Sequence, residues 1–146
     1  MKRTVAILFL VASIFTMLSC GGSAEKQAKE TKDSAKIETI AEGDVVIYYF
    51  HSKQRCRTCI GIQNVAQEAF SEAFADNNKV KFVELDFTER SNAELANRYE
   101  IAFSSLVVAT STEHTNLTDF AFANVNSNPD ALKDALVEEV KKYLSK

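Results

Sequence analysis

The sequence predicts one α/β domain in which helices cover both faces of a mixed β-sheet. Three observations lead to this fold class. Strand-like and helix-like segments alternate from residue 45 onward, a hairpin pattern follows them, and the 146 residues are 46% apolar and 25% charged, as in average globular proteins. A chain of this length buries a core without disulfide staples, and three cysteines are too few for a disulfide-stabilised mini-protein.

The predicted elements follow the order β-α-β-α-β-β-α. The first strand covers residues 45–50, a continuous run of β-branched and aromatic residues typical of a strand covered on both faces. A polar loop at 51–57 leads into a helix whose apolar residues recur three and four positions apart. These residues are Ile62, Val65, Ala66, Ala69, Phe70, Ala73 and Phe74.

Two strands and a short helix are predicted next, followed by a hairpin. Residues 80–87 are rich in strand formers, and residues 92–99 are expected to form the helix. Residues 106–109 form the third strand, and residues 117–125, after a polar turn at 111–116, are its expected antiparallel partner. The tyrosines and phenylalanines at 45–50 and 120–125 are expected in the core because of their strand spacing.

The last predicted helix has the clearest start. Asn128 is suited to cap it, Pro129 occupies its first turn, and Asp130 favours the positive end of the helix dipole. Its apolar stripe consists of Leu132, Leu136, Val140 and Leu144. The sequence therefore predicts an amphipathic helix that packs one face on the sheet.

The N-terminus is expected to be a lipoprotein signal peptide at residues 1–19. Two basic residues precede an apolar run at 5–18, which at about 1.5 Å per residue is too short to span a hydrocarbon core of about 30 Å. The run ends in Met-Leu-Ser-Cys, which resembles the lipobox of bacterial lipoproteins. This resemblance implies lipid on Cys20, and hence an exported protein anchored to a membrane of the cell envelope, on the periplasmic side. Ordinary cleavage and an uncleaved anchor are the alternatives.

Residues 20–42 are small and polar and are expected to form a tether, so the folded domain is predicted at 43–146. The net charge of −3 and the pI near 5.4 argue against nucleic-acid binding, which needs a basic surface.

Cys56 and Cys59 are the candidate reactive residues. They lie three positions apart, between a buried strand and the start of a helix, where free backbone N–H groups and the helix dipole favour a thiolate. Three nearby cations, with no acid between residues 44 and 68, strengthen this effect; they are Lys53, Arg55 and Arg57. We expect the pKa of Cys56 to lie below that of a free thiol, Cys56 to attack a disulfide, and Cys59 to resolve the mixed disulfide.

From about residue 45 to residue 144 the chain resembles the thioredoxin-like superfamily. The resemblance rests on the strand-CxxC-helix segment, the strand at 80–87, the helix ending in Arg-Tyr-Glu-Ile at 98–101, and the terminal hairpin and helix. It implies a three-layer α/β/α fold and thiol-disulfide oxidoreductase activity without a cofactor. Together with the predicted export, this resemblance implies envelope proteins with thiols or disulfides as partners. The sequence leaves open whether a membrane electron donor re-reduces the pair, and therefore whether it works as reductant or oxidant.

Three positions depart from the thioredoxin pattern. Ser105 stands where thioredoxins place a cis-proline, and Tyr48 or Tyr49 takes the place of their buried acid, so that proton transfer from Cys59 would need water or His51. The loop before the motif is about two residues longer and carries Arg55 where an aromatic residue is usual. The predicted surround of the cysteine pair is therefore His51, Lys53, Arg55, Arg57, Thr58, Ser104 and Ser105.

The same residues allow two other interpretations. The cysteine pair with His51 and His114 could form a Cys₂His₂ zinc site, or two chains could supply four thiolates to a metal or cluster. Alternatively, the pair is a static disulfide on an interaction module, although its small loop would stabilise the chain little.

Overall fold

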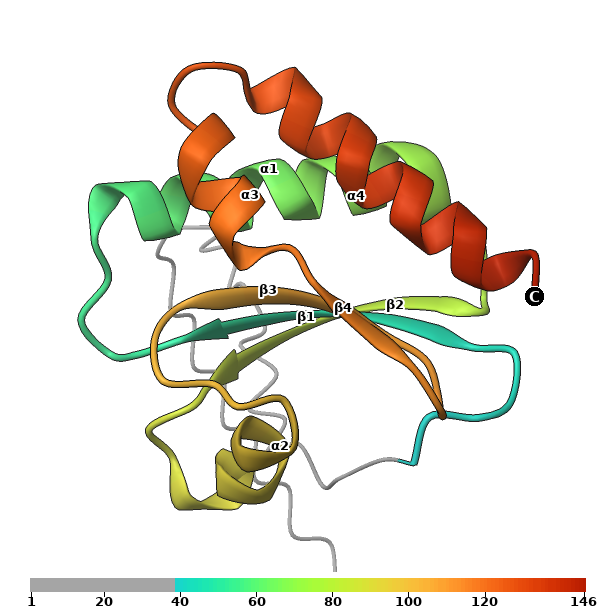
Figure 1. The fold of residues 1–146 in the computed structure, drawn as a ribbon, viewed down its shortest axis with the longest axis horizontal. Coiled ribbons are helices and arrows are strands. Elements are labelled where there is room, and N and C mark those ends of the chain that lie inside the picture. The colour runs from blue at the N-terminus through green and yellow to red at the C-terminus, as the bar shows by residue number, and fades with distance from the viewer. Residues whose placement is uncertain (1–38) are drawn as a thin grey trace, which may run out of the picture. The chain divides into compact units, whose positions relative to one another are not determined.

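The computed structural model describes residues 39–146. Its elements in chain order are β1 (Val45–His51), α1 (Arg57–Phe74), β2 (Val80–Asp86), the 3₁₀-helix η1 (Arg90–Asn92), α2 (Ala93–Arg98), β3 (Ser105–Ala109), β4 (His114–Asn116), α3 (Thr118–Asn124) and α4 (Pro129–Leu144) (Figure 1). The predicted signal peptide, Cys20 and most of the predicted tether lie outside the described residues. Within residues 39–146, no helix has the length and apolar character needed to cross a membrane.

The four strands form one mixed sheet in the order β2-β1-β3-β4. β1 is parallel to β2 and antiparallel to β3, and β4 pairs antiparallel with β3. Helices α1, α3 and α4 cover one face of the sheet and α2 covers the other (Figure 1). This confirms the predicted three-layer α/β/α arrangement around a mixed sheet.

β1 is the central strand because both of its faces are apolar. Val45, Ile47 and Tyr49 face the core formed with α1, α3 and α4. The alternate side chains of β1 pack in a second core with Leu95 and Tyr99 from the α2 side of the sheet. A continuous apolar run, rather than an alternating one, is what a strand between two helical layers requires.

The predicted strand at 117–125 is wrong, because this segment forms helix α3 and the partner of β3 is the shorter β4. The side chain of Asn116 accepts a hydrogen bond from the Thr118 amide at 2.9 Å, and Thr118 Oγ1 accepts one from the Leu106 amide at 3.1 Å. These bonds end the β3–β4 ladder and turn the chain into a helix. Ala121 and Val125, four residues apart, are buried in the first core, which is the helical period.

The C-terminal helix begins as predicted. The Asn128 side chain accepts a hydrogen bond from the Ala131 amide, and Pro129 is the first residue of α4. Leu132, Leu136 and Val140 are fully buried in the first core, and Leu144 packs against it. At the other end of the described chain, Ile40, in the segment predicted as tether, is buried in the second core.

Candidate redox site

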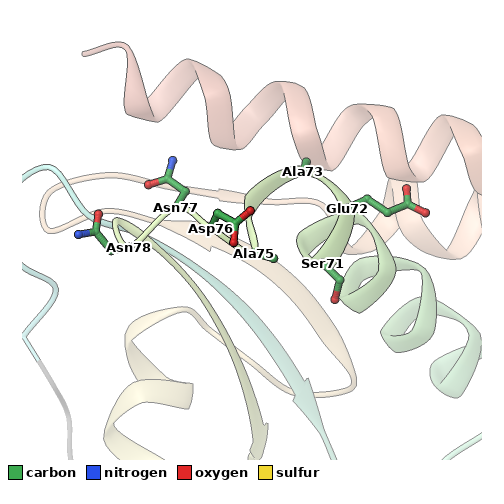
Figure 2. A pocket seen from close by; sticks show the side chains of 7 residues that line it. All are labelled: Ser71, Glu72, Ala73, Ala75, Asp76, Asn77 and Asn78. Carbon is green, nitrogen blue, oxygen red and sulfur yellow. The ribbon is translucent and has the colours of Figure 1, made fainter.

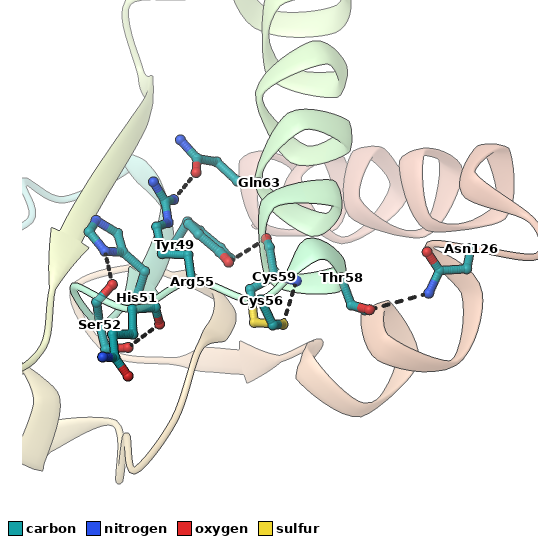
Figure 3. The surroundings of a disulfide bond; sticks show 10 residues. Tyr49, His51, Ser52, Arg55, Cys56, Thr58, Cys59, Gln63 and Asn126 are labelled. Carbon is teal, nitrogen blue, oxygen red and sulfur yellow. Dashed lines mark hydrogen bonds between the residues drawn. A yellow bond between two sulfur atoms is a disulfide. The ribbon is translucent and has the colours of Figure 1, made fainter.

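Cys56 and Cys59 form a disulfide at the N-terminus of α1 (Figure 3). Their Cα atoms lie 5.0 Å apart. Cys56 is exposed, whereas Cys59 is 9% exposed and belongs to the buried residues of α1. An external thiol therefore reaches Cys56 more readily than Cys59. This asymmetry suits the predicted order of attack, which stays a prediction.

The position of Cys56 is that of the N-cap of α1. Its backbone is extended, with φ −75° and ψ 159°, and its sulfur accepts a hydrogen bond from the Cys59 amide with an N–S distance of 3.0 Å. The Cys56 carbonyl accepts the first helical bond, from the Ile60 amide. Because an N-cap side chain faces free N–H groups at the positive end of the helix dipole, a thiolate on Cys56 would be stabilised there.

Tyr49 lies beneath the first turn of α1, on the side of β1 that faces this helix. Its hydroxyl donates a hydrogen bond to the Cys59 carbonyl at 2.5 Å, and its side chain is fully buried (Figure 3). Burial raises the pKa of Tyr49, and the Arg55 charge and the Ser104 hydroxyl offset only part of this rise. Tyr49, and not Tyr48, therefore occupies the space next to the cysteines, as a neutral hydrogen-bond donor.

The linear sequence suggested that no acidic residue lies near the cations around the motif. The structure shows that one does. The fold brings Glu84 of β2 to Arg55, with 3.0 Å between Glu84 Oε1 and Arg55 Nη2. His51 Nε2 lies 3.2 Å from the same carboxylate oxygen, and Gln63 donates to the other oxygen at 2.5 Å. The Arg55 guanidinium also hydrogen-bonds Gln63 and lies 5.8 Å from the centre of the Tyr49 ring. Glu84 is thus a site residue that the sequence analysis missed.

Ser104 and Ser105 lie beside the C-terminal end of β1. Ser105 is opposite Phe50 in the β1–β3 register, and its hydroxyl donates to the Phe103 carbonyl at 2.8 Å. Both serines are buried, and Ser104 interacts with Tyr49. Residues 39–146 contain no cis peptide bond, so the backbone at Ser105 is trans.

The other predicted members of the site surround the motif more loosely. Thr58 Oγ1 accepts a weak hydrogen bond, at 3.5 Å, from Asn126 Nδ2, which follows α3 (Figure 3). Lys53 and Arg57 are exposed. Burial works to raise the pKa of Asp86, but the hydrogen bonds from Thr88 and the charges of His51 and Lys53 lower it overall.

The two histidines are not brought together, which argues against the Cys₂His₂ zinc site. His114 pairs with Ala109, and Ala109 pairs with Val46 at the start of β1. His51 ends β1, five residues later, or about 16 Å along the strand. The imidazole of His114 packs against the ring of Tyr99, with ring centres 5.0 Å apart. In the described part of the chain, no group of three His, Cys, Asp or Glu residues is placed to hold a metal ion.

Three large apolar side chains are exposed in the described part of the chain, and all come from segments next to the motif. Ile60 of α1 is 43% exposed, Phe103 before β3 is 55% exposed, and Phe120 of α3 is 42% exposed. The rings of Phe103 and Phe122 lie 6.2 Å apart, which joins α3 to the Ser104 loop. Phe120 was expected in the core. Its exposure follows from the helical, not extended, conformation of this segment.

A surface pocket lies at the opposite end of α1 from the cysteines (Figure 2). It is lined by Ser71, Glu72, Ala73, Ala75, Asp76, Asn77 and Asn78. The 18 residues of α1 span about 27 Å, so this pocket is remote from the disulfide. None of its residues is a thiol or a histidine, and we assign it no chemistry.

Comparison with known proteins identifies a family by sequence. The family model of the EVE domain matches residues 22–130. This is a different family from the thioredoxin-like superfamily that the cysteine motif resembles. No curated protein matches the chain significantly.

Two solved structures are similar in fold at low identity. An X-ray structure of Fasciola hepatica thioredoxin has 18% identity and a TM-score of 0.45, and covers 70% of this chain and 83% of its own. A structure described as that of a malarial protein has 14% identity and a TM-score of 0.44, and covers 64% of this chain and 98% of its own.

Proposed function

We propose a redox function for this chain, which belongs to the EVE domain family: thiol-disulfide exchange at Cys56 and Cys59. One observation carries the proposal. The pair closes a disulfide in which Cys56 is exposed at the N-cap of a helix and Cys59 is buried one turn later. A helix N-terminus lowers thiol pKa values, and an exposed, stabilised thiolate is the species that attacks a disulfide.

The reaction follows from the two positions. In the reduced protein, the Cys56 thiolate attacks one sulfur of a substrate disulfide, forming a mixed disulfide and releasing a substrate thiolate. The Cys59 thiol then loses its proton, and its sulfur attacks Cys56. This step restores the Cys56–Cys59 disulfide and releases the second substrate thiol, so two electrons have passed to the substrate. The reverse sequence oxidises a substrate dithiol.

The substrates we propose are proteins, because exposed apolar side chains occur on the segments that flank the cysteine pair. Ile60, Phe103 and Phe120 are exposed in segments that flank it. An extended segment of a partner with apolar residues next to its cysteine would cover them while its sulfur reaches Cys56. A membrane electron donor would complete the cycle by reducing the disulfide.

We also propose that the protein acts in the cell envelope, anchored through lipid on Cys20. This part rests on the sequence alone: the apolar run at 5–18 and the cysteine that ends it. Labelling cells with a fatty-acid analogue should mark the wild-type protein and not Cys20→Ser. Equal labelling of both would contradict the anchor and leave the redox proposal intact.

The decisive test of the redox function is trapping. Cys59→Ser should accumulate mixed disulfides with partner proteins in cells, because the resolving thiol is gone, whereas Cys56→Ser should accumulate none. The wild type should accelerate the reduction of insulin by dithiothreitol. Cys56→Ser should give no acceleration. An unchanged rate in Cys56→Ser would reject the proposal and favour a static disulfide on a binding module.

A further inference from the structure

A polar cluster, which we call the Glu84 cluster, adjoins the cysteine motif through Arg55, the residue before Cys56. It consists of His51, Arg55, Gln63 and Glu84, which come from β1, the loop before α1, α1 itself and β2. All three other side chains contact the single Glu84 carboxylate, at 3.2, 3.0 and 2.5 Å for His51, Arg55 and Gln63. The carboxylate is about one-third exposed, so these contacts are only partly screened by water.

The cluster determines where the guanidinium of Arg55 points. Arg55 directly precedes Cys56, yet its guanidinium turns toward Gln63 and away from the disulfide (Figure 3). There it is paired with Glu84 and lies over the Tyr49 ring. A cation paired with a carboxylate stabilises a neighbouring thiolate much less than a free cation does, because the two fields largely cancel.

We propose that Glu84 is a positioning residue that sets the redox equilibrium of the Cys56–Cys59 pair by neutralising Arg55. The inference rests on the proposed function only in treating this pair as redox-active. Reduction of the disulfide by two glutathione thiols yields the Cys56 thiolate, the Cys59 thiol, one glutathione disulfide and one proton released to solvent. Anything that stabilises the thiolate therefore shifts this equilibrium toward the dithiol. With its carboxylate, Glu84 makes the disulfide less oxidising than the basic sequence around Cys56 predicts.

The test is the equilibrium constant of the full-length protein with reduced and oxidised glutathione. Glu84→Gln leaves Arg55 unpaired, so the constant should shift roughly threefold to tenfold toward the dithiol. The pH profile of Cys56 alkylation should move to lower pH in the same variant. Arg55→Gln removes the guanidinium and leaves Glu84 with only His51 and Gln63 as partners, so both readouts should shift in the opposite direction. The double variant should return close to the wild type, since it again carries no net charge.

Glu113→Gln is the matched control. Glu113 is an exposed carboxylate paired with Lys146. It directly precedes β4, at the end of the sheet where β1 begins, whereas the motif follows the end of β1. The same change of charge there should leave the equilibrium within twofold of the wild type. The unfolding midpoint of each variant shows whether it is folded, and the opposite signs of the two single variants separate electrostatics from general disruption.

Two results would overturn the inference. One is a Glu84→Gln constant within twofold of the wild type, and the other is a shift of Arg55→Gln in the same direction as Glu84→Gln. The glutathione equilibrium needs no turnover of a protein substrate. A protein that fails to reduce insulin but shows the opposite shifts would therefore refute the oxidoreductase proposal and retain the role of Glu84.

Discussion

Tyr49→Phe is expected to destabilise the protein by about 1–2 kcal/mol. The variant removes one hydroxyl from a fully buried ring and keeps the rest of the packing. It deletes the 2.5 Å hydrogen bond to the Cys59 carbonyl, and the net contribution of such a bond is about 1 kcal/mol. It also leaves the buried Cys59 without this donor, which adds up to about 1 kcal/mol. For a domain of this size, each kcal/mol corresponds to about 4–8 °C in Tm.

The assay is urea unfolding of the oxidised protein, followed by circular dichroism, with thermal unfolding as a second measure. Because burial raises the pKa of Tyr49, the phenol stays a neutral donor, and the difference from the wild type should be constant between pH 6 and about pH 9. Tyr99→Phe is a control for location, because Tyr99 packs in the other core. It should leave the rate at which Cys59 resolves a mixed disulfide unchanged, whereas Tyr49→Phe should alter it. A destabilisation below about 0.5 kcal/mol would refute the role given to the Tyr49 hydroxyl.

Three further outcomes are expected. Phe103→Ser should lower kcat/KM for a protein disulfide roughly tenfold and leave exchange with glutathione unchanged, since this ring is 55% exposed and only a large substrate would contact it; equal losses with both substrates would contradict this. Burial works to raise the pKa of Glu139, but the hydrogen bond from Thr115 and the Lys142 ammonium lower it overall, so its stabilisation is present above about pH 4.5 and is lost as the pH falls through the folded-state pKa. Urea unfolding should show Glu139→Gln about 1 kcal/mol less stable than the wild type at pH 7, and the difference should shrink as the pH falls below about 4.5; a constant difference would contradict it. Asn128→Ala should lower the free energy of unfolding by about 1 kcal/mol through loss of its cap on α4, and Asn128→Asp should retain most of the wild-type value.

Elements whose signals are local were predictable. β1 is a continuous apolar run, and α4 carries its cap, its proline and its stripe within a few residues. The error at α3 arose because Phe120 and Phe122 alternate with alanines, which imitates the period of a strand. Ala121 and Val125 both contact the first core, four residues apart, and these contacts depend on the tertiary structure and not on the local sequence.

The position of the two cysteines between a strand and a helix was predictable from the sequence, and their surroundings were less so. The N-cap position of Cys56 follows from the adjacent strand and helix, which the sequence shows directly. Glu84 is 28 positions away from Cys56 and reaches the site only because β2 pairs parallel to β1, with Tyr49 opposite Glu84. A side chain that reaches a site through the pairing of two strands cannot be predicted from the sequence next to the motif.

The place of β2 in the sheet adds a second consequence for Glu84. In the described part of the chain β2 is an edge strand, so one row of its backbone N–H and C=O groups has no strand partner. Long edge strands invite a second molecule to pair with them, and charged side chains discourage such pairing. Lys81 and Glu84 are the exposed charges on this strand. The residue that we propose to tune the disulfide is therefore also one of the two exposed charges on the strand edge where a second molecule would have to pair.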